Sequence, residues 1–285
     1  ALGIQSLLAP HPVTDHLCDE PFVESTLAEL AKLDAEDFVV IGGGGLFMDY
    51  FTPFWEGFLP LADKVPFAIW GVGYCDLKRE PSHVASELLQ AIVGKSQLCI
   101  VRDELTRKYL SVSDLAAPVI CPSVVIIEKE APRLGMLHVD NYTTAGAEVY
   151  DVMDTLAREF ACNTHRAFSA SNNRIAPGNK GEMNEILKRY AYSDIILSSA
   201  LHGCIIGLAM GRKVLAVSGD RKIEAFMEAL GLGEWVCDIA NVDTILERLV
   251  ELESQPAVGD AIAQAISENR EVASQIKTLA GLSRV

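Results

Sequence analysis

The chain of 285 residues has few basic side chains and no long apolar run. Lysine and arginine together number 24 against 39 aspartates and glutamates, which gives a formal net charge of −15. Nucleic acid is bound by surfaces rich in lysine and arginine, so this balance argues against a nucleic-acid partner. No apolar stretch reaches the roughly 18–20 residues that span a bilayer, and no secretory signal is recognisable. We therefore expect a cytoplasmic protein.

Paired cysteines are also missing. The seven cysteines are scattered without a Cys-x-x-Cys pair and leave an odd count. This pattern argues against a disulfide framework and favours a reducing compartment. His11, His16 and Cys18 lie close together, but they stand in a proline-containing loop and no second pair of ligands follows. Solvated loop residues are therefore favoured over a metal site, and we expect neither a metal nor a cofactor.

Buried strands alternate with helices along the chain, which is typical of α/β proteins. A charged segment with a proline, residues 128–135, separates two such series and marks a domain boundary. We predict an N-terminal Rossmann-like domain over 1–130 and a C-terminal Rossmann-like domain over 131–256. A helix within 257–285 is expected to pack on the domains. The alternation implies two parallel sheets, in domains that face each other across a cleft.

In the first domain, a glycine loop and an arginine follow buried strands. The strand Phe38–Ile41 runs into Gly42–Gly45, which matches neither G-x-G-x-x-G nor a Walker A loop. Such a loop lets backbone N–H groups approach a ligand, or else it is a turn that packs on a neighbouring strand. Arg102 ends another strand. It could bind an anion, or it could make a structural contact with Asp103 or Glu104.

In the second domain, residues 192–232 read as strand, turn, helix, strand, turn and helix. Ser198 and Ser199 are expected to cap the first of these helices, which His202 and Gly203 open. A histidine there stands at the carboxyl end of a strand and the amino end of a helix, where open α/β sheets bind ligands. The alternative for His202 is a helix-capping residue bonded to a neighbouring carbonyl.

His138 ends another predicted strand and is a second candidate, although a lone histidine is more often a satisfied core residue. The polar turns at the carboxyl ends of the strands are expected to line one cleft: Gly42–Gly45, Arg102, His138 and Ser198–Gly203.

The sequence around His202 resembles the polysaccharide pyruvyl transferases. The family's pattern is S-x-x-L-H-G, then A-x-G-x-P-V-x-A, D-x-K and F-x-x-x-L-G-L. It stands here as Ser198–Gly203, Ala209–Val214, Asp220–Lys222 and Phe226–Leu232. The loop 42–49 and the segment 101–110 are similar to the family's first-domain signatures, so the resemblance runs from about Gly42 to Leu232.

This resemblance implies a two-domain fold of the glycosyltransferase-B type. It also implies transfer of a pyruvyl group from phosphoenolpyruvate to a sugar of a bacterial-type exopolysaccharide or cell-wall glycan, with formation of a cyclic ketal. The expected partners are phosphoenolpyruvate and a sugar or lipid-linked oligosaccharide acceptor. Transient contact with membrane-bound glycan assembly machinery is expected as well. One departure is Ala200, which stands where many members carry an arginine.

The reaction assigns roles to particular residues. Protonation of the enol carbon and attack by a hydroxyl need a group that exchanges protons near neutral pH, and His202 is the candidate general acid and base. Arg102 and Lys222 are candidate anion ligands, although a lysine in a first helical turn is often merely solvated. The other candidate substrate-binding residues are Gly43, Gly44, Gly45, Ser199, Leu201 and Gly203.

Two other functions fit the same sequence. A glycosyltransferase of this fold could use the glycine-rich loops to hold the diphosphate of a nucleotide sugar. A catalytically silent member could instead act as a binding or assembly subunit. Ala200 favours this alternative, and so does the lack, in this sequence, of the early N-x-G-D loop that the resemblance leads us to expect.

Overall fold

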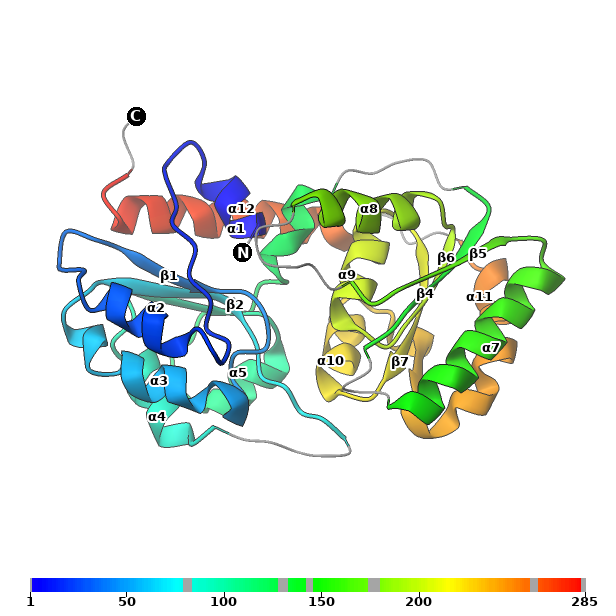
Figure 1. Ribbon diagram of the computed structural model, residues 1–285, viewed down its shortest axis with the longest axis horizontal. Coiled ribbons are helices and arrows are strands. Elements are labelled where there is room, and N and C mark those ends of the chain that lie inside the picture. The colour runs from blue at the N-terminus through cyan, green and yellow to red at the C-terminus, as the bar shows by residue number, and fades with distance from the viewer. Residues whose placement is uncertain are drawn as a thin grey trace. The chain divides into compact units, whose positions relative to one another are not determined.

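The computed structural model describes residues 2–78, 84–127, 133–141, 146–173, 180–256 and 261–282. The chain forms two compact units, each built around one parallel sheet (Figure 1). The first unit comprises Ala1–Asp76, Pro81–Ile126 and Ala263–Val285, and the second comprises Leu77–Glu80 and Ile127–Ile262.

The first unit contains a three-stranded sheet in the order β1-β2-β3. Its strands are β1 (Val39–Gly42), β2 (Phe67–Val72) and β3 (Leu98–Val101), and both neighbouring pairs are parallel. All six residues of β2 are buried, because this central strand is covered on both faces. Its helices are α1 (Leu2–Leu8), α2 (Val23–Leu30), α3 (Thr52–Phe58), α4 (Ser86–Val93), α5 (Glu104–Leu110) and α12 (Ala261–Leu279).

Alternate residues of β2 divide the core of this unit in two. Phe67 and Ile69 belong to the cluster that contains the buried side chains of α3 and α4, whereas Ala68 and Trp70 pack with those of α1 and α12. Figure 1 shows α2–α5 on one face of the sheet and α1 with α12 on the other. The period of two along the strand thus selects the helices that each residue contacts.

A buried asparagine fixes α12 to the first unit. The indole Nε1 of Trp70 donates a hydrogen bond to Oδ1 of Asn269 at 3.0 Å. The amide nitrogen of Asn269 donates to the carbonyl oxygens of Ile120 and Ala265, both at 2.8 Å. The polar atoms of this fully buried side chain are therefore satisfied, as a buried amide requires.

The second unit contains a five-stranded parallel sheet in the order β5-β4-β6-β7-β8. Its strands are β4 (Gly135–Val139), β5 (Ala167–Ser171), β6 (Ile195–Ser198), β7 (Lys213–Ser218) and β8 (Val236–Asp238). The helices are α7 (Ala147–Asn163), α8 (Lys180–Ala191), α9 (Leu201–Ala209), α10 (Arg221–Ala229) and α11 (Ile245–Ser254). Figure 1 shows α7 and α11 on one face and α8–α10 on the other. Because every pair is parallel, the carboxyl ends of all five strands meet at one edge.

The remaining helical segments are short 3-10 turns over Asp49–Phe51, Leu61–Asp63, Pro122–Ile126, Gly233–Trp235 and Ile239–Thr244. None of the helices in the described part of the chain combines the length and the apolar character that a membrane crossing requires. The expectation of a parallel-sheet α/β fold with two sheets is confirmed.

Candidate functional site

The sheet of the second unit has a topological switch point between β4 and β6. The connection after β4 leads to β5 on one side, whereas the connection after β6 leads to β7 on the other. Ligands of open α/β sheets bind outside the carboxyl ends of the strands at such a point. The residues that follow the two strands are Asp140 and Asn141 after β4, and Ser199 and Ala200 after β6. This is the position where the fold favours a ligand.

Two serines brace the turn after β6. Oγ of Ser198 accepts a hydrogen bond from the N–H of Ala200 at 3.1 Å and donates to the carbonyl oxygen of the same residue at 2.9 Å. Oγ of Ser199 accepts from the N–H of Asn141 at 2.9 Å and donates to Oδ1 of Asp140 at 3.3 Å. The turns after β4 and β6 are therefore joined directly.

The expected capping role of these serines is wrong. Ala200 occupies the N-cap position of α9, with extended backbone angles. The hydroxyl of Ser198 is used within the turn itself, and that of Ser199 is used on the neighbouring turn. An alanine cannot accept a hydrogen bond through its side chain, so the N-cap residue of α9 contributes no side-chain cap.

His202 is the exposed residue of an otherwise buried helix. Of the nine residues of α9, all except His202 are buried. A helix that is apolar all round belongs in the interior. The imidazole in its first turn consequently stands at the sheet's carboxyl edge on a backbone that packing holds in place.

Gly203 permits that packing. A Cβ at this position would lie 2.1 Å from Oγ of Ser198 and 2.9 Å from Cγ1 of Val139. The first turn of α9 can approach β6 and β4 this closely because residue 203 has no side chain. The glycine thus sets the position of the neighbouring His202.

Lys222 stands in the first turn of α10, which follows β7, and it is paired there with a buried carboxylate. Asp220, which is fully buried, caps α10 by accepting the N–H of Lys222 at 3.1 Å. Nζ of Lys222 lies 2.6 Å from Oδ2 of the same aspartate. A direct role of Lys222 in anion binding stays a prediction. An incoming anion would meet a lysine that is already paired with the carboxylate of Asp220.

Lys78, which lies far from α10 in the sequence, contacts the turn between β7 and α10. Its N–H donates to the carbonyl oxygen of Gly219 at 3.0 Å, and its Nζ lies 2.5 Å from Oδ2 of Asp238 and contacts Glu224. The hydrogen bond from Lys78 is the largest of the effects that lower the pKa of Asp238. Sequence reasoning missed Lys78, because a lysine in a loop far from the motif carries no local signal of this contact.

The candidate glycines of the first unit follow β1. The N–H of Gly43 donates to the carbonyl oxygen of Trp70 at 3.1 Å, which extends the pairing of β1 with β2. A Cβ on Gly45 would lie 2.1 Å from Sγ of Cys75, whereas Gly44 has a φ of +76° and open space around it. Close packing thus accounts for Gly45, and a left-handed backbone conformation accounts for Gly44. Ligand binding by this loop stays a prediction.

Arg102 follows β3 and is paired within the first unit. Its Nε donates to Oδ2 of Asp103 at 3.0 Å and its Nη2 donates to the carbonyl oxygen of Tyr74 at 3.3 Å. The guanidinium also packs against Gly73, where a Cβ would come within 2.1–2.7 Å of its atoms. The side chain is 4% exposed. The structural contact with Asp103 is present, and anion binding by Arg102 stays a prediction.

His138 lies within β4 and packs under α7. Its side chain is fully buried, its Nδ1 lies 3.3 Å from Oδ1 of Asp154, and its ring stacks on Tyr150 with centroids 5.3 Å apart. Burial lowers the pKa of His138, and the hydrogen bond and charge of Asp154 oppose that effect without cancelling it. These contacts are those of a core histidine.

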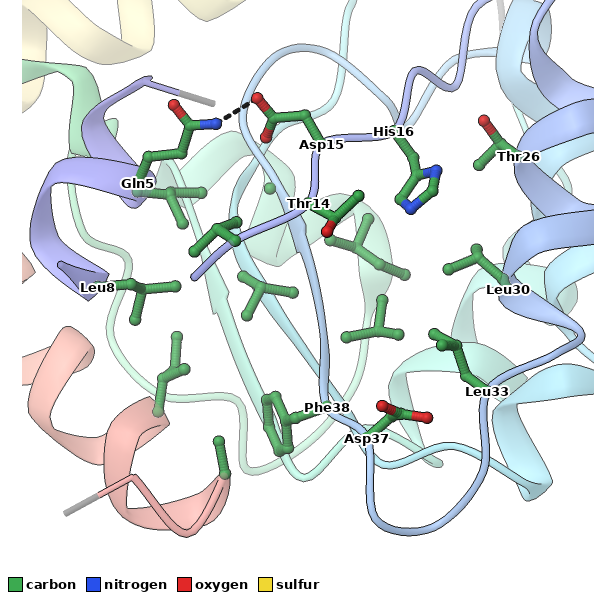
Figure 2. A pocket seen from close by; sticks show the side chains of 18 of the residues that line it. Gln5, Leu8, Thr14, Asp15, His16, Thr26, Leu30, Leu33, Asp37 and Phe38 are labelled. Carbon is green, nitrogen blue, oxygen red and sulfur yellow. Dashed lines mark hydrogen bonds between the residues drawn. The ribbon is translucent and has the colours of Figure 1, made fainter. Parts of the chain in front are cut away.

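A pocket of about 520 Å³ in the first unit lies along β1, from Asp37 to Gly42 (Figure 2). Its walls include the N-terminal segment, α2 and the end of α12, and Gln5 donates a hydrogen bond to Asp15 at its rim. Apolar side chains make up most of the lining, and none of the described lining residues is a lysine or an arginine. The described lining therefore offers no lysine or arginine to an anionic substrate.

His11, His16 and Cys18 line this pocket. Burial, together with the charge of Asp19, raises the pKa of the Cys18 thiol to about 12, so the thiolate that binds metal is disfavoured. Within the part of the chain that the structure describes, no group of three or more histidine, cysteine or acidic side chains is arranged to hold a metal ion.

The structure separates the predicted site residues into two groups. Ser199, Leu201, His202, Gly203 and Lys222 lie at the carboxyl edge of the five-stranded sheet, while Gly43–Gly45 and Arg102 lie at that of the three-stranded sheet. Leu201 is 4% exposed, so its side chain belongs to the core. The sequence analysis did not identify Asp140 and Asn141, although their position directly after an apolar strand was a usable signal.

Two parallel α/β sheets of this kind define a protein of the glycosyltransferase-B fold type, and solved structures support this class. S. aureus MnaA, in a co-structure with UDP, is similar with a TM-score of 0.56 and 11% identity, covering 99% of this chain and 87% of that chain. A putative UDP-N-acetylglucosamine 2-epimerase from Listeria monocytogenes gives a TM-score of 0.56 and 12% identity, covering 94% and 81%. Methanocaldococcus jannaschii UDP-GlcNAc 2-epimerase gives a TM-score of 0.55 and 10% identity, covering 97% of this chain and 87% of that chain. At such identities the likeness shows the fold alone.

The chain belongs to the polysaccharide pyruvyl transferase family, whose sequence model matches residues 9–221. A search of curated proteins found no match to this sequence. The family predicted from the motif around His202 is thereby confirmed.

Proposed function

We propose that this protein transfers a pyruvyl group from phosphoenolpyruvate to a sugar of a bacterial-type exopolysaccharide or cell-wall glycan, and that His202 is the general acid and base. The observation that carries the proposal is the exposed imidazole of His202 on the buried helix α9, beside the switch point of the sheet. A protein of the polysaccharide pyruvyl transferase family needs a proton-exchanging group at its site, and His202 has the position and chemistry for that role.

The chemistry balances with one imidazole. Protonated His202 gives its proton to the methylene carbon of phosphoenolpyruvate, and positive charge develops at the carbon that bears the phosphate. A sugar hydroxyl adds to that carbon, and neutral His202 takes the hydroxyl proton. A second hydroxyl of the sugar then displaces inorganic phosphate, which closes the ketal, and the proton of that second hydroxyl leaves on the phosphate. No oxidant or reductant is consumed.

The N-terminus of α9 supports binding of the anionic donor. The N-cap residue is Ala200, whose side chain makes no capping hydrogen bond, and the positive end of the helix dipole favours an anion at this terminus. In many members of the family an arginine stands at this position, and here the helix terminus takes over part of its role. Lys222 and Arg102 are further proposed anion ligands, each through rearrangement of its present carboxylate pair.

The remaining elements of the proposal follow from the same reaction. The protein works in the cytoplasm, without a cofactor or a metal. Its acceptor is a sugar or a lipid-linked oligosaccharide, and it makes transient contact with membrane-bound glycan assembly machinery.

Phosphate release from phosphoenolpyruvate, measured against a panel of galactose-, glucose- and mannose-type acceptors, tests this function. His202→Asn should lower kcat by about 100-fold or more, the range that general acid–base catalysis contributes. His165→Asn is the matched control, because His165 is an exposed histidine of the same unit whose φ of 55° an asparagine tolerates. Equal turnover by the two variants would remove His202 from the mechanism.

Nucleotide-sugar transfer is the alternative, because S. aureus MnaA shares the fold and was seen with UDP. Thermal unfolding separates the two functions. Phosphoenolpyruvate, and not UDP-GlcNAc, should raise the Tm. A rise with UDP-GlcNAc alone would favour the nucleotide-sugar enzyme. Absence of turnover in both the wild-type protein and His202→Asn, with phosphoenolpyruvate still bound, would favour a silent binding subunit, for which Ala200 is the motivating residue.

A further inference from the structure

A pocket of about 600 Å³ opens in the second unit beside the switch point. It is formed by the ends of β4 and β5 and by the start of α7. Its size lies within the range of about 300–1,000 Å³ that is usual for small-molecule sites. The residues that line it are Asp140, Asn141, Ala147, Tyr150, Asp151, Ala170, Ser171 and Asn172.

The lining is polar and carries negative charge. Asp140 and Asp151 contribute carboxylates, Asn141 and Asn172 contribute amides, and Ser171 adds a hydroxyl. None of the described lining residues is a lysine, an arginine or a histidine. A phosphate or carboxylate ligand would therefore approach two like charges, and the described lining residues supply no cationic side chain to offset them. Sugar hydroxyls, in contrast, donate to carboxylates and exchange hydrogen bonds with amides.

The surroundings of Tyr150 have the same negative electrostatic character. Burial raises the pKa of its hydroxyl, and the nearby carboxylates Asp154, Asp140 and Asp151 raise it further against the opposing charge of Arg158. The phenol thus keeps its proton and remains a hydrogen-bond donor. Its ring is held by stacking on the buried His138. The wall of the pocket therefore has a fixed aromatic side chain among hydrogen-bonding groups, which suits a polyhydroxylated ligand.

The pocket is joined to the turn that leads to His202. Asp140 accepts a hydrogen bond from the hydroxyl of Ser199, and the N–H of Asn141 donates to the same hydroxyl. Ser199 lies three residues before His202 in the chain. A ligand held by Asp140 and Asn141 would therefore contact the loop that is tied to the turn before the candidate general acid and base.

We propose that this pocket binds the neutral sugar that accepts the pyruvyl group. The proposal rests on the function proposed above, and it specifies where the acceptor binds and which residues bind it. Phosphoenolpyruvate is excluded from this pocket by its own charge and binds on the α9 side of the switch point.

The test measures sugar binding and transfer separately. Binding of the methyl glycosides of galactose, glucose and mannose is measured by saturation-transfer NMR without phosphoenolpyruvate, and Kd is obtained by titration. The variants are Asp151→Asn and Asn172→Ala, whose side chains are exposed, so the fold should tolerate both changes. Glu159→Gln, an exposed carboxylate on the same helix α7, is the matched control because it lies outside the pocket.

We expect at least one glycoside to bind the wild-type protein. Its Kd should rise by about tenfold or more in both pocket variants, as loss of a hydrogen bond to a charged or amide group predicts, and by less than about twofold in the control. In the phosphate-release assay, the KM for the acceptor should rise similarly while the KM for phosphoenolpyruvate stays within about twofold.

Three results overturn the sugar pocket. They are failure of every glycoside to bind the wild-type protein, equal effects of the pocket variants and the control, and displacement of the glycoside by phosphoenolpyruvate. If the variants lose glycoside binding while no acceptor supports phosphate release, the sugar pocket stands and the proposed pyruvyl transfer fails.

Discussion

The hydroxyl of Ser199 accepts a hydrogen bond from the N–H of Asn141 at 2.9 Å, so a side chain after β6 orders the backbone after β4. These two residues follow the strands on either side of the switch point, which makes the bond a direct link across the favoured ligand position.

Ser199→Ala should break this link. The N–H of Asn141 loses its acceptor, and the hydroxyl bond to Asp140 disappears with it. We expect the free energy of unfolding to fall by about 1–2 kcal/mol, and the KM for the acceptor to rise more than kcat falls. Ser254→Ala, an exposed serine that bonds only within its own helix turn, is the control for urea unfolding and kinetics. Equal effects of the two substitutions would show that the link is unimportant.

Gly203→Ala should force α9 away from β6 and β4. The added methyl group would lie 2.1 Å from Oγ of Ser198, and such overpacking costs about 1–3 kcal/mol. Because His202 is the next residue, kcat should fall together with stability. Gly233→Ala has its nearest contact at 3.3 Å on the flexible side chain of Glu228 and serves as the control. An active Gly203→Ala protein with an unchanged Tm would contradict the packing argument.

Lys78→Met should weaken the acid dependence of stability. The Lys78 hydrogen bond is the main cause of the lowered pKa of Asp238. A carboxylate with a lowered folded-state pKa stabilises the fold above its unfolded value of about 4, and that contribution disappears as the pH falls through the folded value. The variant should therefore lose less Tm between about pH 5 and pH 3 than the wild-type protein does. The exposed Lys64→Met is the control.

His138→Gln tests a basic group whose pKa is lowered in the folded protein, in contrast to the carboxylate of Asp238. Because burial lowers the pKa of His138, the unfolded chain binds its proton more readily than the folded chain does. Stability should therefore decrease as the pH falls below about 6.5, the ordinary value for histidine. In the variant, the Tm should depend less on pH between about 7 and 5. His16→Gln changes an exposed histidine, and an identical flattening in both variants would reject this assignment.

Arg102→Met should destabilise the first unit by about 3–5 kcal/mol, because the buried carboxylate of Asp103 loses its partner. Arg107→Met removes a half-buried arginine that pairs with Glu104 at the surface, and it should cost at most about 1 kcal/mol. Urea unfolding measures both. If Arg102 also binds the donor, the conservative Arg102→Lys protein should show a raised KM for phosphoenolpyruvate at a temperature where it remains folded.

The class of fold was predictable because its signals are local. Apolar runs such as Ile195–Ser198, each followed by a turn and a helix, specify buried parallel strands without any knowledge of their partners. The position of His202 followed from the same pattern. Strand order depends on contacts between segments distant in sequence, so the switch point beside Asp140 was not readable from the residues.

The side-chain directions of Ser198, Ser199 and His138 were not predictable from the sequence, for one physical reason. Serine is a residue type that often caps helices, but the hydroxyls of Ser198 and Ser199 bond within and between turns. Tertiary contacts decide which partners these hydroxyls have. His138 has the position of an edge residue, but the strand pleat turns its side chain under α7 toward Asp154. In both cases the residue type was informative, and the direction of the side chain required the fold.

The hydrogen bond between Trp70 and Asn269 also bears on the order in which the two units fold during synthesis. Helix α12 closes one face of the first sheet, yet the ribosome makes it after the whole of the second unit. The second unit can acquire all its strands while β2 still exposes the indole of Trp70 to water or to a chaperone. The domain that is begun first is thus completed last, and truncation before α12 should leave the second unit folded and the first one open to proteolysis.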